Sequence, residues 1–159
     1  MIETSYVMIK PEFANEVCVI EYVKSRLLSV GLTIEAEGYI QYTEKEAKKH
    51  YAEHVGKDFY PELEKYITSD KAYGMKVAGD DAIAIIRENV GKTKNPDKGT
   101  IRQVVPVMLK RPERVTQNVV HASDKIEAAE TELAIFYSLN PEKDLSIFEE
   151  RNNSTTNNL

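Results

Sequence analysis

The stretch LTIEAEGYIQY, from Leu32 to Tyr42, alternates apolar and polar side chains and is rich in residues that favour β-strands. Successive side chains of a strand point to opposite faces, so this alternation predicts a strand with one buried face. Gly38 interrupts the alternation, and we expect a bulge or bend there. Gly31 directly precedes the stretch and is expected to end a helix. A helix therefore leads straight into this strand.

The residues before Gly31 complete a β-α-β unit. SYVMI, at Ser5–Ile9, is a short apolar run that predicts a buried strand, and Lys10-Pro11 ends it. Apolar residues between 16 and 30 recur at the spacing of one helix face. Strand, helix and strand thus follow one another at the start of the chain.

The rest of the chain continues this alternation. Thr43 and Glu46 have the spacing of a capping box at the start of a polar helix. The elements expected from there on are helices over 43–55 and 61–67, a strand over 72–78, a helix over 81–91, a long loop over 92–117, a strand over 118–121 and a helix over 125–137. Without its middle helices, this order is the split β-α-β pattern of a ferredoxin-like fold, an α/β (α+β) sandwich in which helices cover a four-stranded antiparallel sheet.

The composition is typical of a soluble globular protein. Of the 159 residues, 42% are apolar and 30% are charged, and no apolar run approaches the ~18 residues that a membrane span needs. We expect one domain over 1–140 and a C-terminal extension over 141–159 whose end is disordered. No secretory signal is visible, and the single Cys18 can form no internal disulfide. A cytoplasmic location and a buried structural thiol are therefore expected.

The charge is acidic overall but locally basic. A net charge of −5 argues against a broad nucleic-acid-binding face, while a small cationic pocket remains compatible with it. The segment RENVGKTKNPDKGTIR, residues 87–102, gathers positive charges and hydroxyl groups around two glycines, as a phosphate site would. It has neither a Walker A sequence nor Gly-x-Gly-x-x-Gly. On its residues alone, a solvated basic loop is the more common structure.

Two of the three histidines lie on the polar helix. His50 and His54 stand four residues apart, a spacing that can chelate a metal. No third ligand is evident in the sequence, and the His-Glu-x-x-His motif is absent. We therefore expect a solvated helix face here and no metal site.

The third histidine, His121, lies in NVVHASD, residues 118–124, where a strand gives way to a helix. A nucleophilic histidine needs a neutral ring with one nitrogen free and the other held by an acceptor. Ser123, Asp124 and Glu132 are candidates to support the ring. On these residues alone, a structural histidine beside a helix cap is the more common arrangement.

Five segments resemble motifs of the nucleoside diphosphate kinase family. NVVHASD resembles that family's active-site signature, Asn-x-x-His-Gly/Ala-Ser-Asp. The other matching segments, in chain order, are VMIKP (7–11), HYAEHVGKDFY (50–60), GKTKNPDKGTIR (91–102) and SDKIEAAETEL (123–133). The resemblance covers residues 3–140, and several motifs in the right order are far more specific than any one of them.

The resemblance implies a ping-pong phosphotransferase that moves the γ-phosphate of a nucleoside triphosphate such as ATP to a nucleoside diphosphate, with low base specificity. It implies that His121 is the nucleophile, phosphorylated on its pros nitrogen (Nδ1), and that Ser123 and Glu132 support its ring. The nucleotide-binding residues that it implies are Lys10, Tyr51, Phe59, Arg87, Thr93, Arg102 and Asn118, with Phe59 stacked on the base. Mg²⁺ is expected to arrive with the nucleotide, since no carboxylate cluster forms a dedicated cage. The implied partners are ATP, ADP and other nucleotides and copies of the same chain in a hexamer or tetramer, with no nucleic acid and no membrane.

Some segments depart from the family pattern. Glu12-Phe13 stands where the family has Asp-Gly, Lys94 is an additional residue after Thr93, and residues 103–105 replace Gly-Asp-Phe. The segment 105–117 is longer than expected, which questions the assembly more than the chemistry. One alternative is a divergent, catalytically weak member that serves as a nucleotide-binding or interaction module. A ferredoxin-like RNA-binding domain is disfavoured by the acidic charge and by the missing aromatic strand motif.

Overall fold

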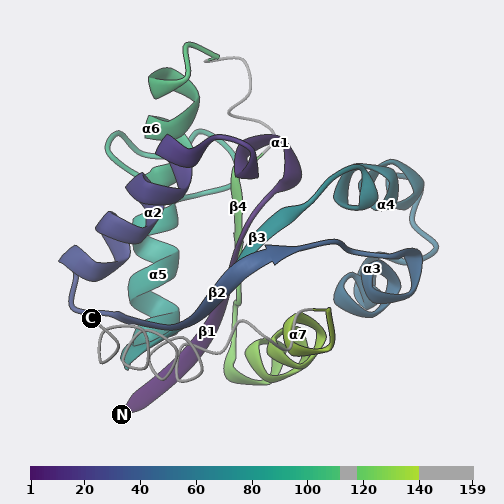
Figure 1. Ribbon diagram of the computed structural model, residues 1–159, viewed down its shortest axis with the longest axis horizontal. Coiled ribbons are helices and arrows are strands. Elements are labelled where there is room, and N and C mark those ends of the chain that lie inside the picture. The colour runs from purple at the N-terminus through teal and green to yellow at the C-terminus, as the bar shows by residue number, and fades with distance from the viewer. Residues whose placement is uncertain (112–117, 140–159) are drawn as a thin grey trace, which may run out of the picture.

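The computed structural model describes residues 1–111 and 118–139 (Figure 1). Within these residues one sheet is built from β1 (Ile2–Ile9), β2 (Thr33–Ile40), β3 (Ala72–Asp80) and β4 (Val120–Ala122). The strands lie in the order β2-β3-β1-β4, and each neighbouring pair is antiparallel. This arrangement confirms the predicted sandwich with a four-stranded antiparallel sheet.

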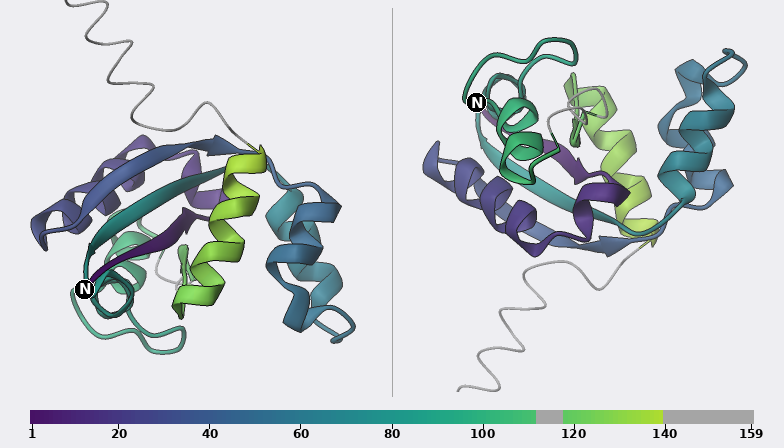
Figure 2. Two further views of the ribbon diagram at one scale, coloured as in Figure 1. Left: turned by 90° about the horizontal axis from the view of Figure 1, so that it is seen from below. Right: turned by 90° about the horizontal axis from the view of Figure 1, so that it is seen from above.

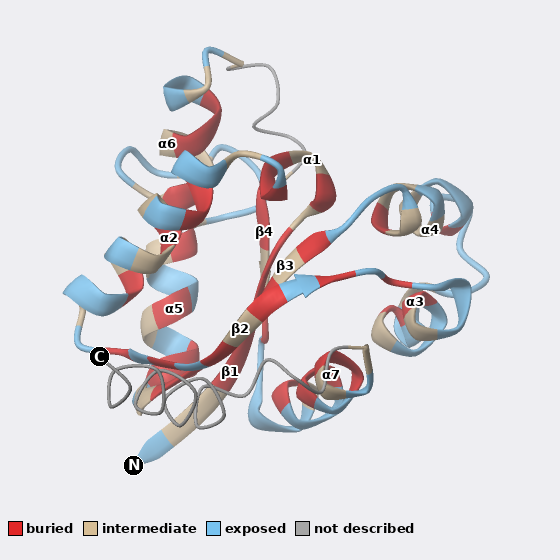
Figure 3. Ribbon diagram, in the orientation of Figure 1, coloured by how far each residue is buried: buried red, intermediate tan, exposed pale blue. Residues whose placement is uncertain are grey.

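Helices cover both faces of the sheet (Figure 2). They are α1 (Pro11–Ala14), α2 (Val17–Ser29), α3 (Glu44–His50), α4 (Tyr60–Thr68), α5 (Ala82–Val90), α6 (Ile101–Met108) and α7 (Ile126–Leu139), with a 3₁₀ turn at Ala52–His54. Buried residues of α1, α2, α5 and α6 form one apolar cluster, and those of α3, α4 and α7 form a second. In Figure 3, buried and exposed residues lie on different sides of α2, α5 and α7.

Strand β1 lies in the middle of the sheet and contributes to both clusters. Tyr6 and Met8 belong to the α3/α4/α7 cluster, and Val7 and Ile9 belong to the other. The alternation of faces along a strand explains this division. Met8 pairs directly with His121 of β4, and paired residues share a face of the sheet. The side chain of His121 is thereby placed on the side of α3 and α7.

Helix α6 corrects the prediction of a loop over 92–117. Ile101 and Val105 are one turn apart and fully buried, so the segment has a core-facing side. Thr100 and Gln103 have capping-box spacing, and the side-chain oxygen of Gln103 accepts a hydrogen bond from the Gly99 N–H at 3.0 Å. Pro106 and the nearby charged residues favoured a loop in the sequence-based prediction, because proline inside a helix removes a hydrogen bond.

Two further expectations differ from the structure. The irregularity in β2 lies between Ile34 and Ala36 rather than at Gly38. The thiol of Cys18 is exposed, not buried. The proposed extension over 141–159 lies outside the described residues. Of the helices in the described chain, none has both the length and the apolar character that a bilayer crossing requires.

Candidate active site

The backbone turns sharply just before His121. Asn118 and Val119 both have positive φ, at 63° and 49°. The Val120 N–H donates to the Asn118 carbonyl, which closes a three-residue turn centred on Val119. A β-branched residue in this region is strained, at a cost of about 1–3 kcal/mol. Strain of this kind concentrates at functional sites, so the strand that follows is a candidate location for one.

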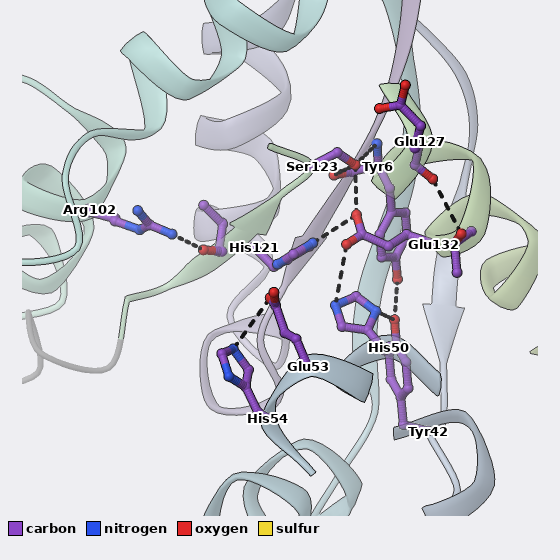
Figure 4. Close-up of polar contacts among 12 residues, drawn as sticks. Tyr6, Tyr42, His50, Glu53, His54, Arg102, His121, Ser123, Glu127 and Glu132 are labelled. Atoms are coloured by element: carbon purple, nitrogen blue, oxygen red, sulfur yellow. Dashed lines mark hydrogen bonds and ion pairs between the residues drawn. The ribbon is translucent and has the colours of Figure 1, made fainter. Parts of the chain in front are cut away.

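A carboxylate from another element supports the His121 ring (Figure 4). Glu132 of α7 places Oε1 2.9 Å from His121 Nε2. The Ser123 hydroxyl donates to the same oxygen at 2.7 Å and accepts the Tyr6 N–H at 3.0 Å. In the tautomer whose proton is on Nε2, that proton lies beside this carboxylate and the lone pair is on Nδ1, although the contact does not have hydrogen-bond geometry. This is the state that a histidine nucleophile requires.

His50 is a member of the site that the sequence prediction missed. Its side chain is fully buried rather than solvated, and its ring centroid is 4.5 Å from that of His121. Its Nδ1 lies 3.2 Å from the Tyr42 hydroxyl, which contacts the Tyr6 hydroxyl at 2.9 Å. Burial lowers the pKa of His50 well below its usual value, and His121 and Lys10 lower it further, so His50 is neutral near pH 7.

A signal for the burial of His50 was present in the helix pattern. Ala47 and Tyr51, three residues before and one residue after His50, are both buried. Residues three and four apart share a helix face, so Ala47 and Tyr51 mark the inner side of α3 and place His50 beside it. His54, four residues further on, differs from His50: it stays partly exposed, and its Nε2 is 3.6 Å from Glu53. The exposure expected for both histidines is therefore correct only for His54.

An open cavity of about 570 Å³ lies beside these residues. The residues from the predicted site that line it are Tyr51, Arg87, Thr93, Arg102, His121 and Glu132. Two guanidinium groups and a hydroxyl therefore face the same space as the supported imidazole. Such a set neutralises an anion with several equatorial oxygens, as a phosphoryl group has.

Arg102 joins the cavity to the backbone around His121. Its guanidinium donates to the carbonyls of Gly91 at 2.7 Å, Asn118 at 3.0 Å and Val120 at 2.9 Å. Burial, together with the charge of Arg87, lowers the pKa of Arg102 to about 10. Three of the five N–H groups of arginine are used in this way, and two remain for a ligand. Arg102 is thus a structural brace as well as a candidate phosphate ligand.

Gly91 is required where this brace attaches. Its φ of 96° lies in the region that favours glycine. A Cβ at this position would lie 2.6 Å from the side chain of Thr100. The loop between α5 and α6 therefore depends on this glycine to bring its carbonyl to Arg102.

The remaining predicted residues lie outside the cavity lining. Lys10 directly follows β1, and its N–H donates to the Val119 carbonyl at 2.9 Å. Burial, with a contribution from Arg102, lowers the pKa of Lys10 to about 8. The Oδ1 atom of Asn118 is buried and has no hydrogen-bond partner within the described residues. Phe59 is half exposed, with its ring 5.2 Å from that of His54.

The described residues contain one group of side chains suited to holding a metal ion. It consists of His50, His121 and Glu132, with one ligand atom from each lying within 4.8 Å of the others. Sequence spacing suggests only His54 as a partner of His50. The partners that the structure gives to His50 instead come from β4 and α7.

Comparison with known proteins agrees with this geometry. The profile of the nucleoside diphosphate kinase family matches residues 3–141. Nucleoside diphosphate kinases of Listeria monocytogenes and Methanobrevibacter smithii are 40% and 39% identical over 139 and 141 residues, which cover 86% and 87% of this chain and 89% of each relative. The structure of a halophilic nucleoside diphosphate kinase from Halobacterium salinarum in complex with CDP matches with a TM-score of 0.75 at 31% identity, covering 86% of this chain and 88% of that one. The apo enzyme of Encephalitozoon cuniculi gives 0.74 at 27% identity, with 84% and 87% covered.

Proposed function

Because the chain belongs to the nucleoside diphosphate kinase family and is a phosphotransferase of that kind, we propose that it carries the phosphate on Nδ1 of His121. The observation that supports this assignment is the contact of 2.9 Å between His121 Nε2 and Glu132. It occupies one ring nitrogen and leaves the other as the nucleophile. Ser123 fixes the carboxylate through its hydrogen bond of 2.7 Å.

The first half-reaction follows from this arrangement. The Nδ1 lone pair attacks the γ-phosphorus, and the bond from phosphorus to the β–γ bridging oxygen breaks as the nucleoside diphosphate leaves. The ring then carries a positive charge, which the carboxylate of Glu132 stabilises through Nε2–H. A second nucleoside diphosphate takes the phosphoryl group by the reverse path, which gives ping-pong kinetics.

The cationic wall of the cavity supplies the rest of the catalysis. Arg87, Arg102 and Thr93 line the space next to the ring. Phosphoryl transfer depends on positioning and on neutralising charge on the equatorial oxygens. Lys10 lies close enough to lower the pKa of His50, and we assign it and Tyr51 to the phosphates and ribose.

Low base specificity follows from how little of the site reads a base. Phe59 offers a half-exposed ring for stacking, and every base has a π-face. We assign Asn118, whose buried Oδ1 has no partner among the described residues, to the ribose hydroxyls. Neither group distinguishes one base edge from another.

Magnesium is part of the proposal as an ion that enters on the nucleotide phosphates. Mg²⁺ requires oxygen ligands, and the one metal-competent group of the described residues contains two imidazoles. The side of the cavity formed by Arg87 and Arg102 therefore suits a metal held by phosphates rather than by protein carboxylates. When bound, Mg²⁺ neutralises phosphate charge during transfer.

Location and assembly complete the proposal. We assign the enzyme to the cytoplasm, which the unpaired Cys18 fits, since disulfides are rare in that compartment. We also expect a homo-oligomer, a hexamer or tetramer. Sedimentation measures the oligomeric state, and a purely monomeric protein would refute this part alone.

Phosphoenzyme formation tests the central assignment and separates it from a catalytically weak family member. Incubation with ATP and Mg²⁺ should give an acid-labile, base-stable phosphoenzyme in the wild type and none in His121→Asn. Initial velocities with a second diphosphate should give the parallel lines of a ping-pong mechanism. Nucleotide binding without phosphoenzyme or turnover would refute the proposal in favour of a binding module.

A further inference from the structure

The carboxylate of Glu132 lies between two imidazoles (Figure 4). Its Oε1 is 2.9 Å from His121 Nε2, and its Oε2 is 4.0 Å from His50 Nε2. The two rings are nearly perpendicular, with an interplanar angle of 67°. The phosphotransfer mechanism uses only the His121 half of this arrangement, so the half formed by His50 has no assigned role.

The Nε2 atoms of His50 and His121 are both buried, and neither has a hydrogen-bond partner within the described part of the chain. A buried polar atom left in this way costs free energy and calls for an explanation. The other ring nitrogen of His50, Nδ1, lies 3.2 Å from the Tyr42 hydroxyl. If Nδ1–H donates to Tyr42, Nε2 presents its lone pair toward Glu132. A histidine held by its second nitrogen in this way is the usual arrangement of a metal ligand.

We propose that His50, His121 and Glu132 bind a transition-metal ion such as Zn²⁺, and that the bound ion inhibits phosphoryl transfer. Two imidazoles and one carboxylate are a ligand set of open zinc sites, in which water takes the fourth position. The same set does not suit Mg²⁺, which prefers six oxygen ligands. The site would therefore select ions different from the one that accompanies the nucleotide.

The distances allow coordination after a small adjustment. Ligands about 2.0–2.1 Å from a tetrahedral zinc are about 3.3 Å from one another. Here one ligand atom from each of the three residues lies within 4.8 Å of the others, and the distances from Glu132 to Nε2 of His121 and of His50 are 2.9 and 4.0 Å. Rotations of the side chains cover this difference. His121 and Glu132 also line the open cavity, through which an ion and its water ligand can enter.

Inhibition follows from the proton of the His121 ring. In the reactive tautomer the proton is on Nε2, facing Glu132, and Nδ1 carries the lone pair. A metal ion on Nε2 displaces that proton to Nδ1 of the neutral ring, and the nitrogen that must attack phosphorus then has no lone pair. The exchange moves one proton within the ring and needs no further reactant. The metal also takes the carboxylate that stabilises the charged ring.

Direct metal binding tests the site without reference to catalysis. The full-length wild-type protein, stripped with a chelator, is titrated with Co²⁺ and with Zn²⁺. We expect one ion per chain and the intense visible absorption of four-coordinate Co²⁺. His50→Gln should weaken Zn²⁺ binding by more than about 10-fold, since loss of even a supporting residue costs 10–100-fold. His54→Gln, which alters the neighbouring histidine of the same segment, should bind as the wild type does.

A second variant covers the possibility that His50→Gln does not fold. Tyr42→Phe keeps the aromatic ring of residue 42 but removes its hydroxyl, which is the partner of His50 Nδ1. It should weaken Zn²⁺ binding by about 10–100-fold. Wild-type binding that is absent, or that survives unchanged in the variants that fold, would overturn the site.

The inhibitory effect rests on the proposed function and is measured separately. With Mg²⁺ and ATP in excess, Zn²⁺ at the concentration that fills the site should abolish the burst of phosphoenzyme. A full burst in the zinc-loaded protein would overturn the inhibitory part. If no phosphoenzyme forms even without Zn²⁺, the proposed function fails while the binding titration still decides the metal site.

Discussion

Replacing Glu132 with glutamine removes the negative charge that faces the His121 ring and changes little else. The amide has nearly the same size as the carboxylate and can still accept hydrogen bonds. Attack by Nδ1 would leave the ring positively charged, with Nε2 at 2.9 Å from a carboxylate oxygen. In the variant this developing charge meets a neutral group, so we expect slower phosphoryl transfer.

The size of the effect follows from the distance and the burial. Two unit charges 2.9 Å apart attract each other by about 6 kcal/mol at an effective dielectric constant of about 20. Only the part gained between the neutral ground state and the charged transition state changes the rate. The net contribution of a hydrogen bond to a charged group, about 1.5–3 kcal/mol, is the better measure of that part. At 1.36 kcal/mol per factor of ten, the rate should fall about 10- to 150-fold.

Rapid-quench measurement of phosphoenzyme formation from labelled ATP reports this step alone. Glu130→Gln removes the same charge from an exposed position on the same helix and should stay within about 2-fold of the wild type. Thermal unfolding checks that Glu132→Gln remains folded at the assay temperature, since Ser123 loses a charged acceptor. A rate for Glu132→Gln within about 2-fold of the wild type, in folded protein, would refute the assigned role of the carboxylate.

Four further predictions concern the cationic and aromatic groups of the site. Lys10 has a pKa of about 8 in the free protein, and bound phosphates should raise this pKa, so nucleotide affinity should fall by up to about tenfold per pH unit above pH 8. Calorimetry on the wild type should show this slope, and Lys10→Met should abolish it. Equal slopes in the two proteins would contradict the assignment of Lys10 to the phosphates. The same shift predicts that the free energy of unfolding contributed by Lys10 rises from about pH 8 toward 10.5, because there the unfolded chain binds a proton that the folded chain has lost. Arg102→Lys keeps the charge but loses at least two hydrogen bonds to backbone carbonyls, so urea denaturation should show that the free energy of unfolding falls by about 2–4 kcal/mol. The matched change at an exposed arginine, Arg87→Lys, should lower it by less than about 0.5 kcal/mol. Equal losses in the two variants would show that Arg102 does not brace the backbone. Phe59→Ala should weaken all nucleotides alike by about 5- to 150-fold without lowering stability, and an effect on one base only would contradict simple stacking.

The parts of the fold that were predicted well are those whose side-chain periodicity matches their burial. Strand β2 alternates as its sequence does, and the buried residues of α2 recur at helical spacing. Helix α6 escaped because Pro106 and nearby basic residues are typical of loops. Its capping signal was local and readable, whereas the burial of Ile101 depends on a core formed by distant elements.

The structure brings several of the predicted site residues together, but many of their contacts could not be predicted. The motifs suggested His121 and Glu132 as partners, and the structure places them 2.9 Å apart. The partners of His50 could not be inferred from its neighbour His54, because the sheet and α7 bring them together from far along the chain. Arg102 was predicted to contact phosphate, but no sequence pattern indicates that it also binds three backbone carbonyls.

The central claim is that Glu132 occupies Nε2 of His121 and thereby directs phosphate to Nδ1. Nitrogen NMR of the isotopically labelled phosphoenzyme distinguishes the two ring nitrogens directly, since the phosphorylated nitrogen couples to phosphorus. We predict coupling at Nδ1, with Nε2 bearing the proton that faces the carboxylate. Coupling at Nε2, or on a residue other than His121, would contradict it.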